Sequence, residues 1–374
     1  MRERGYVRLA VSPQGTIVGR ATLPDTTGMD IPLKQRGRAR IDFEVGVRLA
    51  GQRRQRACEA VLADRGVVAD TLPEDMDARH TLIEATLADV PAWTTQAWLG
   101  DWSAREHGRV CEDAFEEVRD VAAPALDALA EGPTTLTDSG ETMPRYWSGV
   151  WFHRTRGGWD AGPYNGYVHG ELVHRRYVSR IYPGDIYAQR RRVLERLGDL
   201  APRDIVEFGT SSGHYTVALA ERFPDADIIG LDPSRRMLEQ ARRTGNALGH
   251  GWDLRVGVGE DSGLPDASAD LVTSYAVHHE LPPRIIALWF AEAHRLLRPG
   301  GMLLMADVPR YADLDRLAAW RFDRAAKWGG EPFWRASAQM DFAEGARAAG
   351  FVDVATANLA PMGNPHLVVA RKHG

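Results

Sequence analysis

The segment that most constrains the fold runs from Asp204 to Ala220, where an apolar stretch meets a glycine-containing turn and then a helical pattern. Residues 205–208 have the character of a short buried strand, and Gly209 and Gly213 enclose the turn. In a doubly wound α/β sheet, the first strand-to-helix turn brings the backbone close to a ligand, and glycine permits both the approach and the dihedral angles. The segment therefore predicts a ligand crevice at the carboxyl edge of a parallel sheet.

A second apolar stretch, Ile228 to Leu231, ends in the acid Asp232. At this position of a nucleotide-binding sheet, a carboxylate can accept hydrogen bonds from both ribose hydroxyls of a nucleoside. A glycine-containing turn followed by such an acid is also typical of nicotinamide-binding proteins. These two features alone therefore leave a nicotinamide oxidoreductase open.

Four further segments follow in order, and with them the chain resembles the class I S-adenosylmethionine (SAM) dependent methyltransferases from about residue 185 to 374. The segments are Gly259-Glu-Asp-Ser-Gly-Leu-Pro, Asp270-Leu-Val-Thr-Ser-Tyr-Ala-Val-His-His-Glu, Leu296-Leu-Arg-Pro-Gly-Gly-Met-Leu-Leu-Met-Ala-Asp, and Gly350-Phe-Val-Asp-Val with His366-Leu-Val-Val-Ala-Arg-Lys. The first motif departs from the family pattern because Ser211 replaces its middle glycine. No acid–base pair suited to hydride transfer is evident, which disfavours the oxidoreductase.

The resemblance implies SAM as the methyl donor and S-adenosylhomocysteine as its product. It places Glu207, Gly209 and Gly213 at the methionine end, Asp232 at the ribose and Glu260 at the adenine. The expected cofactor-binding residues are Glu207, Gly209, Thr210, Gly213, Asp232, Glu260, Asp261 and Tyr275.

Methyl transfer from a sulfonium is an in-line displacement, so the protein mainly aligns donor and acceptor and excludes water. A general base is needed only for a protonated acceptor. The candidate catalytic residues are His278, His279 and Glu280 after the fourth strand, and His169 and Glu171 in an earlier cluster with His153 and His174. His169 and His174 lack the i, i+4 spacing that places two ligands on one α-helical face, so we expect no bound metal. A metal-assisted C-methyltransferase stays open as an alternative.

Residues 146–187 are rich in Trp, Tyr, Gly and His, unlike the segments on either side. Their position before the methyltransferase-like half matches that of a substrate-capping lid in the family, and aromatic walls suit a flat or apolar acceptor. We therefore expect O- or C-methylation of a small apolar or aromatic metabolite. The alternatives are that these rings bury a domain interface, or that the chain is a non-catalytic SAM-binding or oligomerising module.

The chain of 374 residues is long for one domain. Residues 6–23 predict a hairpin, and 41–131 predict a bundle of three to four helical segments in which a Trp93, Trp98 and Trp102 stripe enters the core. We expect a hairpin plus helical domain at 1–132, an aromatic-rich lid or connector at 133–184 and a methyltransferase domain at 185–374. The predicted fold is α/β, with a seven-stranded, mostly parallel Rossmann-like sheet whose last strand is antiparallel, preceded by a mainly helical N-terminal domain.

The composition limits the kinds of partner and the compartment that we expect for this chain. The formal net charge of −5 gives no field that would attract nucleic acid, and the run Arg190-Arg191-Arg192 predicts the solvated face of a helix. Two distant cysteines fit a reducing compartment, and no apolar run or signal peptide indicates a membrane or export. We expect a cytoplasmic enzyme with a small-molecule acceptor, no nucleic acid, no membrane, and a homodimer formed through the N-terminal helices.

Overall fold

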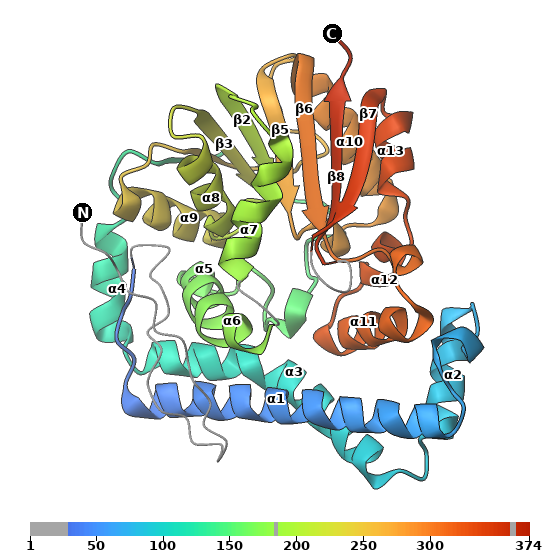
Figure 1. Cartoon of the computed structure of the whole chain (residues 1–374). Coiled ribbons are helices and arrows are strands. Elements are labelled where there is room, and N and C mark those ends of the chain that lie inside the picture. Colours follow the sequence, from blue (N-terminus) through green and yellow to red (C-terminus); the bar gives the residue numbers. More distant parts are fainter. Residues whose placement is uncertain (1–28, 183–185, 360–363) are drawn as a thin grey trace.

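The computed structural model describes residues 29–182, 186–359 and 364–374, and a mixed β-sheet forms its centre (Figure 1). Within these residues the sheet has eight strands in the order β1-β4-β3-β2-β5-β6-β8-β7. The strands are β1 (Thr135–Asp138), β2 (Asp204–Phe208), β3 (Asp227–Asp232), β4 (Asp253–Val256), β5 (Ala269–Tyr275), β6 (Leu297–Asp307), β7 (Phe351–Asn358) and β8 (His366–Lys372). The α/β class and the mostly parallel sheet are therefore as predicted.

The strand count corrects the prediction of seven. Strand β1, from the segment that we assigned to a connector, pairs in parallel with β4 and extends one edge of the sheet. Its residues are mostly exposed, so they carry no buried-strand pattern that the sequence could display. At the other edge β8 runs antiparallel to both β6 and β7, which confirms the reversed last strand.

Two helical layers cover the sheet, because alternate residues of one strand point to opposite faces. Ile205 and Leu271 enter a core with α7 (Ile186–Leu194), α8 (His214–Arg222) and α9 (Arg235–Leu248). Their chain neighbours Val206 and Val272 enter a second core with α10 (Pro283–Leu296) and α13 (Phe342–Ala348). The carboxyl ends of the parallel strands are thereby left free for a site.

From residue 29 onward, four α-helices precede the sheet: α1 (Gln35–Asp64), α2 (Met76–Thr86), α3 (Pro91–Glu116) and α4 (Arg119–Ala128). The long α1 and α3 lie side by side beneath the sheet and its helices (Figure 1). The helical prediction for 41–131 is confirmed, although α1 begins earlier; the predicted hairpin at 6–23 lies outside the described residues. The core prediction for the tryptophan stripe is wrong at Trp98, whose side chain is 64% exposed, whereas Trp93 is buried. The predicted homodimer and domain limits stay predictions.

Helix α11 (Arg316–Gly329) joins the N-terminal helices to the sheet unit. Its Trp320 is fully buried in a cluster with Leu62 of α1 and Ile83 of α2. The guanidinium of Arg324 lies between the rings of Trp93 and Trp328, with its carbon 3.8 and 3.9 Å from the ring centroids. A buried cation sandwiched by aromatic faces fixes the relative position of the two units.

The segment between the N-terminal helices and the sheet packs against both. It contains α5 (Asn165–Tyr167), which contacts α9, and η3 (Val168–Val178), a π-helix that contacts α3. The remaining short elements are η1 (Ala69–Thr71), η2 (Phe152–Arg154), α6 (Ser179–Ile181), η4 (Glu195–Leu197), η5 (His278–Glu280), η6 (Tyr311–Asp313) and α12 (Trp334–Ala338). Among the described residues, no helix is long and apolar enough to cross a membrane.

Candidate active site

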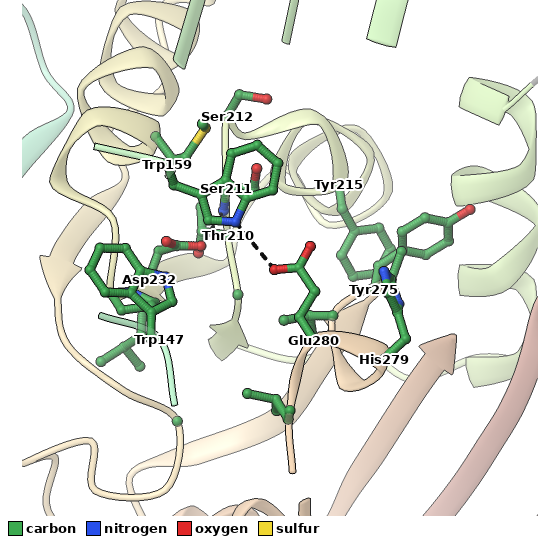
Figure 2. A pocket seen from close by; sticks show the side chains of 18 of the residues that line it. Trp147, Trp159, Thr210, Ser211, Ser212, Tyr215, Asp232, Tyr275, His279 and Glu280 are labelled. Carbon is green, nitrogen blue, oxygen red and sulfur yellow. Dashed lines mark hydrogen bonds between the residues drawn. The ribbon is translucent and has the colours of Figure 1, made fainter. Parts of the chain in front are cut away.

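A cavity of about 200 Å³ opens at the carboxyl ends of β2, β3 and β5. The turn after β2 and the end of β3, which carries Asp232, form one side (Figure 2). The loop after β5 forms the other side, with His279 and Glu280. Aromatic and imidazole rings of the 146–187 segment complete the wall: Tyr146, Trp147, His153, Trp159, His169 and His174.

The turn after β2 has the tight backbone that its glycines predict. Gly209 adopts a positive φ of 73°, and its N–H donates to the Leu231 carbonyl of β3 (2.8 Å). A Cβ at this position would lie 2.8 Å from the Val277 side chain. Ser211, which replaces a family glycine, also adopts a positive φ of 50°, so the turn keeps its left-handed step at some cost in backbone strain.

Asp232 ends β3 with its carboxylate against this turn. Its Oδ2 accepts the Ser211 N–H and its Oδ1 accepts the Ser234 N–H, both at 2.8 Å. Burial raises the pKa of Asp232 to about 7, although these two N–H groups oppose the shift. Each carboxylate oxygen keeps a further acceptor site, and the side chain lines the cavity. Asp232 therefore lines the cavity with acceptor capacity left over, and its ribose contact stays a prediction.

Gly209, Thr210 and Tyr275 also line the cavity, but four other predicted cofactor residues lie outside its lining. Gly213, at the start of α8, packs against Ala241 of α9. Asp261 is exposed to solvent. The cofactor roles of these residues stay predictions.

Glu207 and Glu260 lie behind residues that do line the cavity. Glu207 accepts a hydrogen bond from Thr216 (2.6 Å), and burial raises its pKa to about 8. Glu260 accepts hydrogen bonds from the Tyr146 hydroxyl (2.5 Å) and the Trp289 Nε1 (3.0 Å). Glu260 thus ties the 146–187 segment to α10, an interaction that its sequence motif did not indicate.

The adjacent histidines of η5 occupy different environments. His279 lines the cavity, and its Nδ1 lies 2.7 Å from Asp307 Oδ1 at the end of β6. Burial lowers the pKa of His279, but Asp307 outweighs this effect and raises it above its ordinary value. His278 is buried against Trp289 and lies outside the cavity lining. Of the two, only His279 lines the cavity, and the catalytic roles of both stay predictions.

His153 lies between two carboxylates on the same side of the cavity. Its Nε2 is 3.1 Å from Glu280 Oε1, and its Nδ1 contacts Glu331, which follows α11. Burial lowers the pKa of His153, but Glu331 and Glu280 together raise it well above its ordinary value. Sequence reasoning missed Glu331, because no motif surrounds it and it lies 178 residues beyond His153.

The structure corrects the expectation that the five-residue spacing of His169 and His174 keeps them off one helical face. Both lie on the π-helix η3 and line the cavity, with ring centroids 4.5 Å apart. A π-helix has more residues per turn than an α-helix, so positions i and i+5 can share a face. Glu171 instead lies outside the cavity lining, where it contacts Arg175 and His214, each at 3.4 Å. Its predicted catalytic role stays a prediction.

The prediction of a solvated arginine face is wrong for Arg190. Its neighbours Arg191 and Arg192 are exposed, but Arg190 is only 6% exposed and lines the cavity. Its guanidinium carbon lies 4.8 Å from the centroid of the Tyr275 ring. Among the described residues, Arg190 is the one arginine or lysine in the cavity wall.

Comparison with known proteins identifies the part of the sheet unit from β2 to the start of β6. Residues 205–301 match the family model of the methyltransferase domain, which confirms the class I SAM-dependent methyltransferase resemblance for this part of the chain. The matched residues include the turn after β2, Asp232 and the loop that carries His279 and Glu280.

Individual relatives match a somewhat longer part of this chain, but less than half of their own length. A malonyl-[acyl-carrier protein] O-methyltransferase of Xylella fastidiosa is 35% identical over 114 residues, 30% of this chain and 37% of the relative. A trans-aconitate 2-methyltransferase of Methylobacterium radiotolerans is 36% identical over 117 residues, 30% of this chain and 40% of the relative. The chain thus spans well under half the length of these two curated relatives. The solved structure of Haemonchus contortus phosphoethanolamine N-methyltransferase 2 with SAM is 14% identical, with a TM-score of 0.45, covering 62% of this chain and 61% of that one.

Proposed function

We propose that this chain, whose residues 205–301 form a class I SAM-dependent methyltransferase domain, transfers the methyl group of SAM to an oxygen or carbon of a small acceptor. The observation that carries the proposal is the position of Asp232. Its buried carboxylate faces the cavity beside the backbone turn after β2, where a nucleoside ribose would lie in this architecture. The cavity continues past this point to a second, histidine-rich side.

The donor would lie along the turn. Asp232 would accept the ribose hydroxyls, and Gly209 would let the methionine part approach the backbone. The methionine carboxylate needs a cationic partner, and we assign Arg190, the one arginine in the described cavity wall, to this role. The sulfonium methyl would then point toward the side that carries His279 and Glu280.

The acceptor would lie between the aromatic rings of the 146–187 segment and the η5 loop. Trp147 and Trp159 give apolar surface for a flat or apolar metabolite, whereas His279 and Glu280 give polar contacts to the reacting oxygen or acidic carbon. The relatives are named for two different acceptors, so the acceptor class is inferred here from the cavity wall. Alignment of donor and acceptor, together with exclusion of water, would supply most of the rate acceleration.

A non-catalytic SAM-binding module is the competing function. Such a module would need the donor side of the cavity only. The polar groups of the acceptor side, held by Asp307 and Glu331 behind them, favour the enzyme.

Calorimetry with SAM tests the donor site directly. Asp232→Ala should weaken SAM binding by about 1–3 kcal/mol, because charge-assisted hydrogen bonds to the ribose are lost. Asp227→Ala, which removes an exposed carboxylate from the first residue of the same strand, should leave the affinity unchanged. Equal affinity of the wild-type and Asp232→Ala proteins would remove Asp232 from the site and the proposal with it.

A further inference from the structure

Two histidines and two glutamates meet on the acceptor side of the cavity. They are His153 of η2, His279 and Glu280 of η5, and Glu331 after α11. One ligand atom from each of the four lies within 4.8 Å of the others. This set shares only His153 with the sequence cluster in which we considered and rejected a metal. It could not be found by spacing, because its members come from three separate segments.

The hydrogen bonds of this cluster leave a buried carboxylate oxygen without a partner. The Glu331 side chain is 3% exposed, and its Oε2 accepts no hydrogen bond from the residues that the structure describes. Glu280, on the other side of His153, accepts one hydrogen bond from the indole of Trp159 (3.3 Å; Figure 2). A bare carboxylate oxygen in a buried site costs free energy unless a cation or donor reaches it.

The groups behind the cluster have the arrangement that orients metal ligands. Metal-bound histidines commonly place their other ring nitrogen against a carboxylate, which fixes the ring and raises its basicity. His279 does so through Nδ1 and Asp307, and Asp307 is itself held by the N–H groups of Val277 and His279 (3.1 and 3.2 Å). The Nε2 of His279 is then the nitrogen left for a ligand.

The backbone at His153 is strained, which favours a functional role for this residue. His153 and Arg154 both adopt positive φ angles, 51° and 55°, which non-glycine residues rarely do. Arg154 donates a hydrogen bond from Nε to the Trp328 carbonyl at the end of α11, near Glu331 in the chain. The strained step holds the His153 ring against Glu331 and Glu280 at an energetic cost that the surrounding structure must offset.

We propose that His153, His279, Glu280 and Glu331 bind one divalent transition-metal ion. Two imidazole nitrogens and two carboxylate oxygens form a donor set that suits Zn²⁺, Fe²⁺ or Co²⁺, whereas Mg²⁺ and Ca²⁺ prefer oxygen ligands alone.

Three of the four ligands, His153, His279 and Glu280, line the cavity. With four protein ligands, an ion bound here would keep a position for a further ligand by taking five or six ligands in all, and that position would face the cavity. The acceptor would then bear an oxygen that coordinates the ion, a step that rests on the proposed function. The ion would hold and acidify this oxygen beside the sulfonium methyl.

Titration of the metal-free full chain with Co²⁺ alone tests the site, because bound Co²⁺ absorbs visible light according to its ligands. We expect saturation at one ion per chain. Glu331→Gln and, as a second variant, His279→Gln should each weaken binding at least about 100-fold, and Asp307→Asn about 10–100-fold. Glu260→Gln changes a carboxylate that lies behind the same cavity outside the ligand set, so it should leave Co²⁺ affinity unchanged. Binding that is absent, or equal in wild type, Glu331→Gln and His279→Gln, would overturn the site.

Parallel measurements separate this proposal from the proposed function. S-adenosylhomocysteine binding with and without Co²⁺ reports on the donor site, so intact binding with no Co²⁺ site overturns the metal alone. Intact Co²⁺ binding without any S-adenosylhomocysteine binding overturns the methyltransferase function instead. Azide, used as a small competing ligand, should change the Co²⁺ spectrum; an unchanged spectrum would indicate a closed site and overturn the acceptor contact.

Discussion

The two sides of the cavity differ in how the chain builds them. The donor side comes mainly from neighbouring parallel strands: the turn after β2 and Asp232 at the end of β3 lie within about 30 residues of each other. The acceptor side joins His153, the η5 loop and Glu331, which lie far apart in the chain. One side is a local supersecondary motif, whereas the other depends on how the N-terminal segment and α11 pack onto the sheet.

This difference explains why a family match can identify the donor and leave the acceptor open. Residues 205–301 contain the donor turn and the acid, but His153 and Glu331 lie outside the match. Local motifs persist wherever the sheet does, and loops and inserted segments determine the substrate. We therefore expect changes on the donor side to affect SAM binding, and three measurements can break or sharpen this separation.

The largest effect should come from Gly209→Val, which should abolish measurable SAM binding. Any Cβ at this position meets Val277 at 2.8 Å, and φ is 73°, so the branched side chain must push the turn or the η5 loop out of place. Gly249→Val is the matched control, because φ is 77° there and a Cβ would meet no atom within 4 Å. Calorimetry should show SAM binding in the control alone. Binding by a folded Gly209→Val protein would mean that the donor lies elsewhere.

A smaller effect, about 10–100-fold, should follow Arg190→Met. Loss of the charge-assisted hydrogen bond to the methionine carboxylate weakens SAM binding by about 1.5–3 kcal/mol. Methylthioadenosine lacks the amino acid end, so its affinity should be the same for both proteins, whereas Asp232→Ala should weaken both ligands. If Arg190→Met weakens methylthioadenosine as much as SAM, Arg190 supports the fold of the cavity and does not contact the carboxylate.

The smallest effect concerns pH. The pKa of Asp232 is raised to about 7 by burial, and only its ionised form can accept both ribose hydroxyls. Bound ligand favours the ionised form, so SAM affinity should be full at pH 8 and fall as the pH drops through 7. We expect a loss of roughly tenfold by pH 6. Asp232→Asn should bind SAM weakly and with a flat profile over this range, and a flat wild-type profile would contradict the assignment.

Much of the fold could be predicted because strand and helix patterns alternate regularly after residue 185. The missing eighth strand shows the limit of the method: Thr135–Asp138 is short, mostly exposed and held by β4, which lies more than 100 residues later. Its pairing depends on the edge that β4 offers, and hydrophobic periodicity records only what a segment buries.

The sequence could predict a site residue where a local motif places it in the cavity wall, as it does with Asp232. Arg190 was misread because helical periodicity identifies a polar face but cannot tell which arginine of a run turns into a cavity. The sequence could not distinguish His278 from His279, because their environments depend on residues that are distant in the chain. Asp307 lies against the His279 ring, and Trp289 packs against the His278 ring. Glu331 gave no signal at all, since its role arises only when α11 packs beside His153.

The π-helix η3 places part of this cavity wall under the control of chain length. An α-helix turns by roughly 100° per residue, so the five-residue step from His169 to His174 would set the two side chains roughly 140° apart in an α-helix, whereas the wider π-helix keeps them on one face. A single-codon insertion between them would thus rotate His174 away from His169 while the sheet and the donor turn stay as they are, whereas a single-codon deletion would allow an α-helix with the two histidines four residues apart and again on one face. Divergence of acceptor preference among descendants of this chain could proceed by such length changes as well as by substitution.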